Sequence, residues 1–301
     1  MSKILILFNK KSFNKTLFCD HLKKNLPPNV NVDARDLEDV SVDINFRNIE
    51  ICVGGTNFED YDLVYFRRAG GQFMWLAGTI ALYLNFRGIK YFDTTYREVG
   101  PMGSKLASFL KMAYAGLPVI PSYYCHRSLV NLKEMEIVDK FNLPLVAKEI
   151  SSQRGEGVCL ITKREDFQEL IFKNPEKNYI FQKYIPASEE YRVLVLGQEI
   201  GAYERKTPTD VGEFRSNVAL GAKEEFMDVR DIPENFKVIS LKAAKTLGVE
   251  IAGVDILVDK VGQPWILEVN RGPGITYEDP KSDEMKNLAK FFVQELGNIR
   301  K

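Results

Sequence analysis

Three side chains near the C-terminal end of the chain have the types and spacing of a magnesium site. Glu268 and Asn270 are two residues apart in a predicted strand, so both side chains leave the same face. Asp255 lies inside the preceding apolar strand, where burial of an unpaired carboxylate is expensive. Hard oxygen ligands suit Mg²⁺, especially Mg²⁺ carried by nucleotide phosphates, so residues 253–274 predict a metal site. The alternative is a solvent-facing hairpin whose acids point outward.

A lysine and a glycine-containing loop earlier in the chain have the chemistry of a phosphate site. Lys148 lies in an otherwise apolar predicted strand, and the loop after it carries Ser152, Gly155 and Gly157. Glycine lets backbone N–H groups approach phosphate oxygens, and the lysine adds a positive charge. The alternative is a mobile surface hairpin with Lys148 on its wet face. The segment around Lys105 lacks the residue order of a Walker loop.

The strand predicted over residues 179–183 ends in groups that suit a purine nucleotide. Pro186 breaks this strand, and the residues around the break offer backbone groups to the edge of an adenine. These residues are Gln182, Lys183, Tyr184 and Ile185. The apolar side chain of Ile185 suits the face of the base, and the carboxylate of Glu190 suits the ribose hydroxyls.

Two arginines follow in strands on either side of a two-residue turn. They are Arg192 and Arg205, and a half-buried arginine requires an anionic partner. Cross-strand salt bridges with Glu204 or Glu190 are the alternative. In the polar loop over residues 206–222, the run GEFRSN adds further donors from Arg215 and Asn217, which suit a carboxylate or a phosphate.

Composition narrows the class of protein. The 301 residues include 41 basic and 41 acidic side chains, so no net charge favours nucleic acid or an anionic membrane. No apolar run approaches the roughly 20 residues of a membrane span, and no signal peptide precedes the strand expected at residues 4–8. The four cysteines show no metal-type pairing and read as free thiols. We therefore expect a cytoplasmic protein without nucleic-acid or membrane partners.

The order of predicted elements indicates three units. Strands alternate with helices over residues 1–100, which predicts a small α/β unit with a mostly parallel sheet. No glycine-rich turn follows its first strand, so a dinucleotide fingerprint is absent. Residues 101–187 indicate an α+β unit with an antiparallel sheet. Residues 188–301 contain the arginine strands, the metal hairpin and two helices.

Apolar spacing predicts which helix faces are buried. In a helix expected over residues 128–141, the predicted buried stripe is Leu132, Met135, Val138 and Phe141. In a final helix, which Ser282 is expected to cap, the inward residues are Met285, Leu288, Phe292 and Leu296.

The order of these motifs resembles the ATP-grasp superfamily, and most closely its RimK-like branch of carboxylate–amine ligases. The resemblance covers residues 104–274 and rests on GEFRSN, AGVDIL and LEVNRGPG at their separations. It implies an N-terminal parallel α/β unit followed by two α+β subdomains that clasp ATP between them. The N-terminal unit is compatible with the family's preceding domain but carries no motif of its own.

The resemblance also implies a role for each residue that matches a motif. The phosphate groups would be bound by Lys105, Lys148 and the loop 152–157 with Ser152, Gly155 and Gly157. The adenine and ribose would be bound by Gln182, Lys183, Tyr184, Ile185 and Glu190, with Arg192 beside them. The transferred phosphoryl group would be bound by Arg205, Arg215 and Asn217, and Mg²⁺ by Asp255, Glu268 and Asn270.

One position departs from the family pattern. The branch has a small residue after LEVN, and this chain has Arg271 before Gly272. Arg271 would bind the acid substrate's carboxylate or a second phosphate, or else form a salt bridge outward to Glu278 or Asp279. This departure leaves glutamate addition open as the activity while the predicted ATP site is unaffected.

These features predict an ATP-dependent carboxylate–amine ligase that forms an amide through an acyl phosphate and releases ADP and phosphate. Its cofactors would be ATP and Mg²⁺, with Mn²⁺ as an alternative metal. Its partners would be small-molecule or peptide carboxylates and amines, and a homo-oligomer is left open. The donors beyond those that ATP requires predict a second substrate carboxylate. The alternatives are a non-catalytic nucleotide-binding scaffold and a phosphotransferase that stops at a phosphorylated product.

Overall fold

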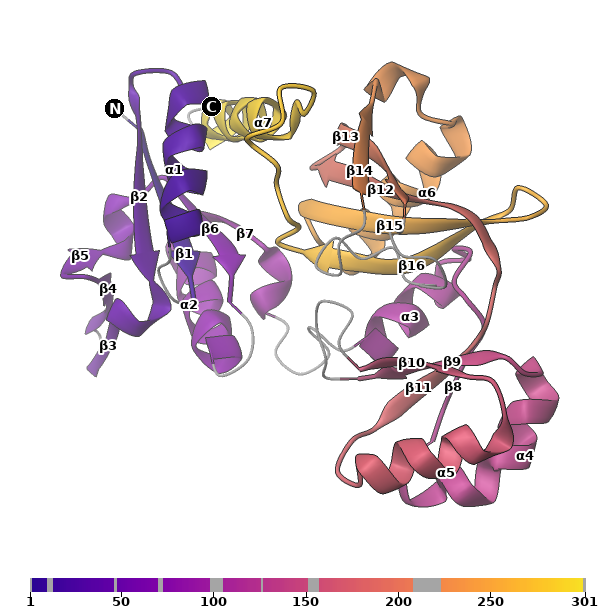
Figure 1. Ribbon diagram of the computed structural model, residues 1–301. Coiled ribbons are helices and arrows are strands. Elements are labelled where there is room, and N and C mark those ends of the chain that lie inside the picture. Colours follow the sequence, from indigo (N-terminus) through magenta and orange to yellow (C-terminus); the bar gives the residue numbers. More distant parts are fainter. Residues whose placement is uncertain are drawn as a thin grey trace.

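The computed structural model describes three packed units and one helix that joins the first to the last (Figure 1). The described residues are 2–9, 13–45, 48–69, 73–97, 105–125, 127–150, 157–207 and 223–299, and the fold is given for these alone. No helix within these ranges is both long and apolar enough to cross a membrane.

The N-terminal unit is built on a parallel sheet with the strand order β2-β1-β6-β7. Its strands are β1 (Ser2–Phe8), β2 (Val30–Asp36), β6 (Leu63–Arg68) and β7 (Lys90–Phe92). β1 is apolar because helices cover both faces of the sheet, α1 (Phe13–Asn25) on one and α2 (Met74–Arg87) on the other. The predicted parallel α/β unit is confirmed.

A small antiparallel sheet extends this unit. Its strands are β3 (Val40–Asn45), β4 (Asn48–Val53) and β5 (Thr56–Asn57). The short 3₁₀ helices of the chain lie at Leu37–Asp39, Phe58–Asp60, Thr94–Arg97, Arg127–Leu129 and Val229–Asp231.

The middle unit contains an antiparallel sheet, as predicted, and the strand order is β10-β9-β11-β8. Its strands are β8 (Ser122–Tyr124), β9 (Leu145–Glu149), β10 (Val158–Ile161) and β11 (Tyr179–Lys183). One face packs on α4 (Val130–Phe141) and α5 (Arg164–Lys173). From the other face, Ile180 enters the core beneath the C-terminal sheet.

The predicted buried stripe of α4 is partly wrong. Leu132 and Met135 are exposed, whereas Val130, Ile137 and Phe141 are buried. Apolar side chains occupy more than one face of this helix, so spacing alone permitted two stripes. Packing against α5 and β11 selects the stripe that contains Ile137.

The C-terminal sheet has the strand order β14-β13-β12-β15-β16 and is antiparallel throughout. Its strands are β12 (Ala187–Leu196), β13 (Glu199–Thr207), β14 (Lys223–Met227), β15 (Ile251–Asp259) and β16 (Pro264–Arg271). One face packs on α3 (Lys105–Tyr114) and α6 (Glu234–Leu247) through Val254 and Ile256. Asp255 lies between those two residues in β15 and points to the opposite face.

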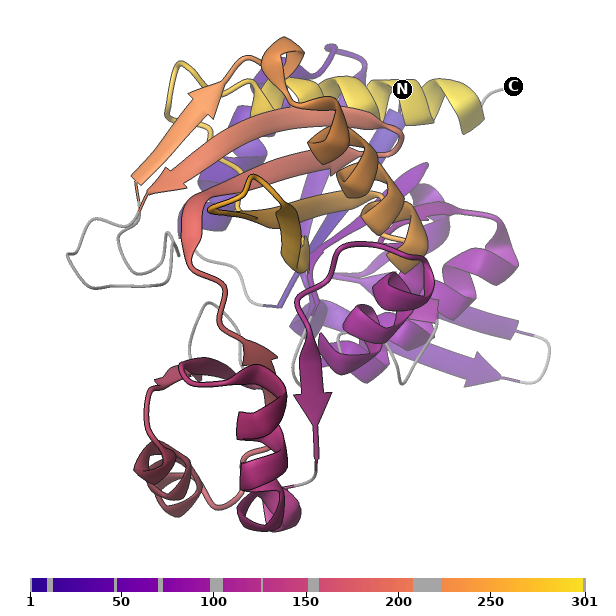
Figure 2. The same cartoon turned by 90° about the vertical axis from the view of Figure 1, so that its right-hand side faces the viewer.

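The last helix leaves the C-terminal sheet and returns to the N-terminal unit. α7 (Glu284–Ile299) lies beside α1 in Figure 1 and along the top of the molecule in Figure 2. The predicted inward residues Met285, Leu288, Phe292 and Leu296 are all buried. They share a core with β1, α1 and the turn end of β12, so the C-terminal 188–301 segment is packed into the N-terminal unit at its end.

Candidate functional site

The three predicted metal ligands come together on one face of the C-terminal sheet. Asp255 lies opposite Glu268 in the β15–β16 register, and Asn270 follows on the same face of β16. The amide nitrogen of Asn270 donates to Asp255 Oδ2 and to Glu268 Oε1, both at 2.8 Å. A donor therefore occupies the point between two acidic side chains, which is also where a cation would be favoured.

Asp255 is held by two cationic side chains from the neighbouring strands. Arg192 on β12 donates to both carboxylate oxygens, at 2.8 and 3.0 Å, and Lys206 on β13 donates to Oδ1 at 3.1 Å. Burial by itself raises the pKa of Asp255, but these two charges outweigh it and lower the pKa to about 2. Asp255 is thus ionised at neutral pH. The cross-strand partner expected for Arg192 is also present, because its Nε lies 3.8 Å from Glu204 Oε1.

Lys206 was not predicted for this site, because the strand was expected to end at residue 205 and a loop to begin at residue 206. β13 continues to Thr207, and the side chain of Lys206 is buried against Asp255. Arg205 precedes it and therefore points to the opposite face, where it pairs with Glu189 and Glu225. The position predicted for Arg205 beside the metal strands is consequently taken by Lys206, and the alternation of side chains along β13 is the reason.

Two lysines, one on β9 of the middle unit and one at the start of α3, lie near these acids. Burial lowers the pKa of Lys148 on β9, and the charge of Glu268 opposes this shift. Burial likewise lowers the pKa of Lys105 at the start of α3, again opposed by Glu268, and Lys105 Nζ donates to the carbonyl of Glu149 at 2.9 Å. The charges of Glu190 and Asp255 also act on Lys148. Lys148 of the middle unit and Lys105 at the start of α3 are thus both close enough to Glu268 to be affected by its charge.

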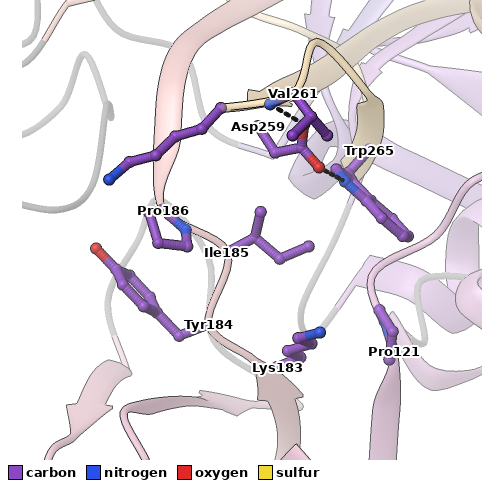
Figure 3. Close-up of a pocket in the computed structure, with 9 residues that line it drawn as sticks. Pro121, Lys183, Tyr184, Ile185, Pro186, Asp259, Val261 and Trp265 are labelled. Carbon is purple, nitrogen blue, oxygen red and sulfur yellow. Dashed lines mark hydrogen bonds between the residues drawn. The ribbon is translucent and has the colours of Figure 1, made fainter.

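A pocket of about 270 Å³ lies where β11 passes into β12 (Figure 3). Lys183, Tyr184 and Ile185, which are among the residues predicted for an adenine hinge, form one side of it. Asp259 at the end of β15 and Trp265 in β16 form the other side, and the Trp265 indole donates to Asp259 Oδ2 at 3.0 Å. These two residues were not predicted for this site, because only the fold brings them to the hinge.

Gln182 is buried behind the hinge, with 1% of its surface exposed. Its Nε2 donates to Ser122 Oγ at 2.7 Å, whereas its Oε1 is buried without a hydrogen-bond partner among the described residues. Glu190 lies in β12 on the face that carries Arg192, opposite Lys206. The pocket, Glu190 and the acids therefore follow one another along the same face of the sheet.

Four of the residues predicted for the site cannot be placed in it. Ser152, Gly155, Arg215 and Asn217 lie outside the described residues. Gly157 has a φ of 71°, and its carbonyl accepts from the backbone N–H of Glu149 at 2.8 Å.

The end of β16 contacts the N-terminal unit. Arg271 Nε lies 3.3 Å from Asp93 Oδ2, so its partner is neither Glu278 nor Asp279, the outward partners considered for it. Gly272 has a φ of 65°, and a Cβ at this position would lie 2.3 Å from the carbonyl oxygen of Arg67. Both residues therefore join the metal strand to the ends of β6 and β7, a long-range contact that sequence spacing does not reveal.

A family model described as the RimK-like ATP-grasp domain matches residues 106–293, more than half of the chain. A curated relative from Enterobacter sp. (strain 638), named probable alpha-L-glutamate ligase, is 37% identical over 136 residues, which cover 44% of each chain. The chain thus spans less than half the length of that relative. Another, from Shewanella sp. (strain W3-18-1), is named probable alpha-L-glutamate ligase 2. It is 28% identical over 242 residues, which cover 78% of this chain and 76% of that protein.

Solved structures share the arrangement of the three units. The ATP-grasp ligase PsnB, complexed with a minimal precursor, has a TM-score of 0.72 at 16% identity and covers 97% of this chain and 99% of its own. D-alanine–D-alanine ligase from Bacillus anthracis, complexed with ATP, has a TM-score of 0.69 at 20% identity, with 100% and 99% covered. At these identities the likeness concerns the fold.

Proposed function

The chain belongs to the RimK-like ATP-grasp family, and we propose that it is a ligase that joins a carboxylate to an amine through an acyl phosphate. The observation that supports this most directly is the placement of Lys105 and Lys148 across from Asp255 and Glu268. A site for Mg²⁺–ATP needs cations on one side, which bind the phosphates. It needs acids on the other side, which bind the divalent metal.

ATP would lie along the face of the C-terminal sheet, with its base in the hinge pocket. The described residues provide no backbone hydrogen bond to Tyr184 or Ile185, so these peptide groups are available to an adenine edge. Gln182 Oε1 has no donor among the residues that the structure describes, and the exocyclic amine of adenine would supply one. The ribose hydroxyls would donate to Glu190, and the phosphates would accept from Lys105 and Lys148.

The acids fit a magnesium ion on the phosphates. Asp255 is ionised, Glu268 faces it, and the Asn270 amide lies between them, so Asp255, Glu268 and Asn270 would hold the metal. No three His, Cys, Asp or Glu side chains gather at one point within the described part of the chain, so the remaining ligands would be phosphate oxygens and water. When bound, the metal would neutralise phosphate charge, and Mn²⁺ is the alternative to compare with it.

The side chains of this chain contribute positioning and charge. Arg192 and Lys206 keep Asp255 ionised and oriented, and Lys206 is close enough to serve a phosphoryl group that approaches the acids. The substrate carboxylate attacks the γ-phosphorus, the bond to ADP breaks, and an acyl phosphate forms. An amine then attacks the acyl carbon, the bond to phosphate breaks, and an amide and phosphate remain after one proton is lost from nitrogen. No nucleophilic side chain is needed.

The comparisons suggest which substrates to test first. The curated relatives are named for L-glutamate, and PsnB was solved with a peptide precursor. We propose L-glutamate as the first amine to test and a peptide carboxylate as the first acid. The cytoplasmic location and the absence of nucleic-acid and membrane partners remain predictions, and the oligomeric state is left open.

The test is incubation of the full chain with ATP, Mg²⁺ and pools of amino acids and peptides, followed by measurement of ADP and product mass. A ligase releases ADP only when both an acid and an amine are present, and its product mass equals their sum less one water. ADP release without an amine, together with a phosphorylated product, would instead indicate a phosphotransferase. ATP binding without ADP release in any pool would indicate a non-catalytic scaffold.

A further inference from the structure

The hinge pocket has a second wall that no step of the proposed function uses. Asp259, at the end of β15, and Trp265, in β16, line this wall, and Figure 3 shows them across the pocket from Tyr184 of the hinge. Trp265 is half-buried, so the chain covers one part of its ring and leaves another part open. An aromatic ring in the wall of a pocket of about 270 Å³ offers a large contact surface to a flat ligand.

The Asp259 carboxylate holds the turn after β15 with one oxygen and the indole with the other. Its Oδ1 accepts from the backbone N–H groups of Val261 and Gln263, at 3.0 and 2.9 Å. Its Oδ2 accepts from Trp265 Nε1 at 3.0 Å. This indole hydrogen bond is the largest of the effects that lower the pKa of Asp259, so the carboxylate is ionised at neutral pH and the bond is charge-assisted. The ring is therefore held by its only hydrogen-bond donor.

The backbone around Asp259 is fixed as well. The N–H of Asp259 donates to the carbonyl oxygen of Gln263 at 3.1 Å, and the N–H of Gly262 donates to the carbonyl oxygen of Asp259 at 3.0 Å. Ser188 Oγ, near the start of β12, donates to the carbonyl oxygens of Val258 and Asp259, at 3.1 and 3.2 Å. Because β12 begins directly after the hinge, these bonds tie the two walls of the pocket together.

These bonds determine what the Trp265 ring can offer to a ligand. Its one polar hydrogen is used by Asp259, so the carbon atoms and the π system of the ring remain for contact. Such contact adds affinity for a flat base but does not read the donors and acceptors on the edge of that base. Reading of the edge is left to the peptide groups of the hinge, on the other wall.

We propose that Trp265 is the wall against which the base of ATP packs, and that Asp259 is a positioning residue that fixes the indole for this contact. The assignment rests on the proposed ATP site and adds two residues of the C-terminal sheet that set its affinity. A ring that is already held in place loses little side-chain entropy when the nucleotide binds. Loss of the bond between Trp265 and Asp259 therefore weakens ATP binding, although no group that touches the phosphates or the metal is changed.

The first test measures the fluorescence of Trp265, because the chain contains only one other tryptophan, Trp75. In a Trp75→Phe variant of the full chain, all indole emission comes from Trp265. A non-hydrolysable ATP analogue with Mg²⁺ should change the intensity of this emission, because the base packs on the ring. Tripolyphosphate with Mg²⁺, which has no base, should leave the emission unchanged. An analogue that binds by calorimetry without a change in emission, or the same change with tripolyphosphate, would overturn the proposal.

Asp259→Asn then separates the indole bond from the turn. Its amide oxygen still accepts from the turn N–H groups, whereas its amide nitrogen faces the indole N–H and cannot accept. Calorimetry should show that the ATP analogue binds about threefold to tenfold more weakly. Trp265→Ala removes the ring and should weaken binding about tenfold or more.

Asp228→Asn is the matched control. Asp228 also accepts from a backbone N–H two residues ahead, that of Arg230, but it lies outside the residues that line the pocket. This variant should bind the analogue as the wild type does. Equal affinity of the wild type, Asp259→Asn and Trp265→Ala would show that the wall does not touch the base.

A double variant tests whether Asp259 acts through Trp265. Trp265→Phe keeps an aromatic ring but lacks the N–H, so Asp259→Asn added to it should weaken binding no further. A further loss as large as that of Asp259→Asn alone would show that Asp259 does not act through the indole, which would contradict its role as a positioning residue.

These measurements separate the assignment from the ligase function. A protein that binds the ATP analogue through Trp265 but forms no amide would support the wall and contradict the ligase. In an active ligase, Asp259→Asn should raise the KM for ATP and leave kcat within about twofold, because the reacting groups are unchanged. An active ligase in which this variant leaves the KM for ATP unchanged would contradict the positioning role alone.

Discussion

Asp255 and Glu268 lie opposite each other in one register but depend on different neighbours. Asp255 balances the charges of Arg192 and Lys206, both largely buried. Glu268 accepts from Asn270. Removing one partner of a buried ion pair lowers the free energy of unfolding strongly, because the other charge is left unpaired. Replacing a carboxylate by a neutral group that still accepts the same hydrogen bond lowers it less. The two acids should therefore share a role in the reaction and differ in their contribution to stability.

Asp255→Asn should lower the free energy of unfolding by about 3–5 kcal/mol, because Arg192 and Lys206 then lack their common carboxylate. Glu268→Gln should change it by less than about 1 kcal/mol, because an amide oxygen still accepts from Asn270. Both variants should lose Mg²⁺-dependent ADP production. Urea denaturation and an ADP assay measure the two properties, and normal ADP production by Glu268→Gln at saturating Mg²⁺ would contradict the metal assignment.

Glu204 predicts how stability varies with pH. Burial raises its pKa to about 8 in the folded chain against an ordinary 4.5, so the folded state holds the proton more tightly. The stabilisation that this raised pKa provides is fully present below about pH 4.5 and is lost as the pH rises through about 8. The free energy of unfolding should therefore fall from pH 5 to pH 8, by at most about 1.4 kcal/mol per pH unit for this one proton.

Glu204→Gln is the matching test, because glutamine has the same shape and does not titrate. Denaturation at several pH values should show a smaller fall than in the wild type. A slope should remain, because the pKa of Glu284 is also raised, to about 7. The effect of Asp255 on the pH dependence of stability has the opposite sign, since its pKa is lowered to about 2. Its contribution to stability is lost only below about pH 4. An unchanged slope would show that Glu204 is not buried as described.

At the scale of elements, the end of β16 must pass close to the end of β6. Gly272 and Gly262 both have positive φ, at 65° and 83°, so alanine is strained at either position. Only at Gly272 would the new Cβ meet backbone, 2.3 Å from the Arg67 carbonyl oxygen, whereas nothing lies within 4 Å at Gly262.

Gly262→Ala should therefore cost only the left-handed strain of about 1–2 kcal/mol. Gly272→Ala should cost roughly 3 kcal/mol or more, because the strand end must also move away from β6. Thermal denaturation of the two variants gives the comparison. Equal losses would mean that β16 and β6 do not approach each other as described.

The lysine on β9 connects the middle unit to the nucleotide. Lys148→Ala should weaken binding of ATP about tenfold or more, because one charge-assisted bond to phosphate is lost. Lys173→Ala, on the exposed end of α5, is the control and should bind ATP as the wild type does. Calorimetry with a non-hydrolysable analogue measures both affinities. The loop 152–157 is expected to close over the phosphates. If it does, bound nucleotide should protect this loop from proteolysis.

At the scale of the whole molecule, the ion pair of Arg271 and Asp93 links the C-terminal sheet to the N-terminal unit. Arg271 Nε lies 3.3 Å from Asp93 Oδ2, and both side chains are largely buried. Arg271→Met should lower the free energy of unfolding by about 3 kcal/mol, because Asp93 is left without its cation. The double variant with Asp93→Asn should lose about 1–3 kcal/mol less than the sum of the single losses, if the two side chains interact.

Chemical denaturation of the four proteins completes this cycle. Additive losses would contradict the pairing. Unchanged stability in Arg271→Met, combined with a KM for the acid substrate raised more than tenfold, would instead restore the role predicted for Arg271 from sequence. α7 strengthens the same link, since Leu288 and Phe292 are buried between β1 and the turn end of β12.

The sequence by itself determined the elements and the chemistry that lies within single strands. The apolar runs and their spacing predicted the parallel N-terminal unit, the antiparallel units and the inward face of α7. The i, i+2 spacing of Glu268 and Asn270 predicted their common face, because side chains alternate along a strand. Motif order was sufficient for the family, since each motif is local.

Only the tertiary structure decided which side chains contact each other between strands and between units. The placement of Lys206 rather than Arg205 beside Asp255 depends on where β13 ends and on its register with β12, and neither is encoded in local spacing. The pairing of Arg271 with Asp93 joins residues more than 100 positions apart. Charge partners at such separations depend on how the units pack, so burial and pairing of these groups are properties of the assembled fold.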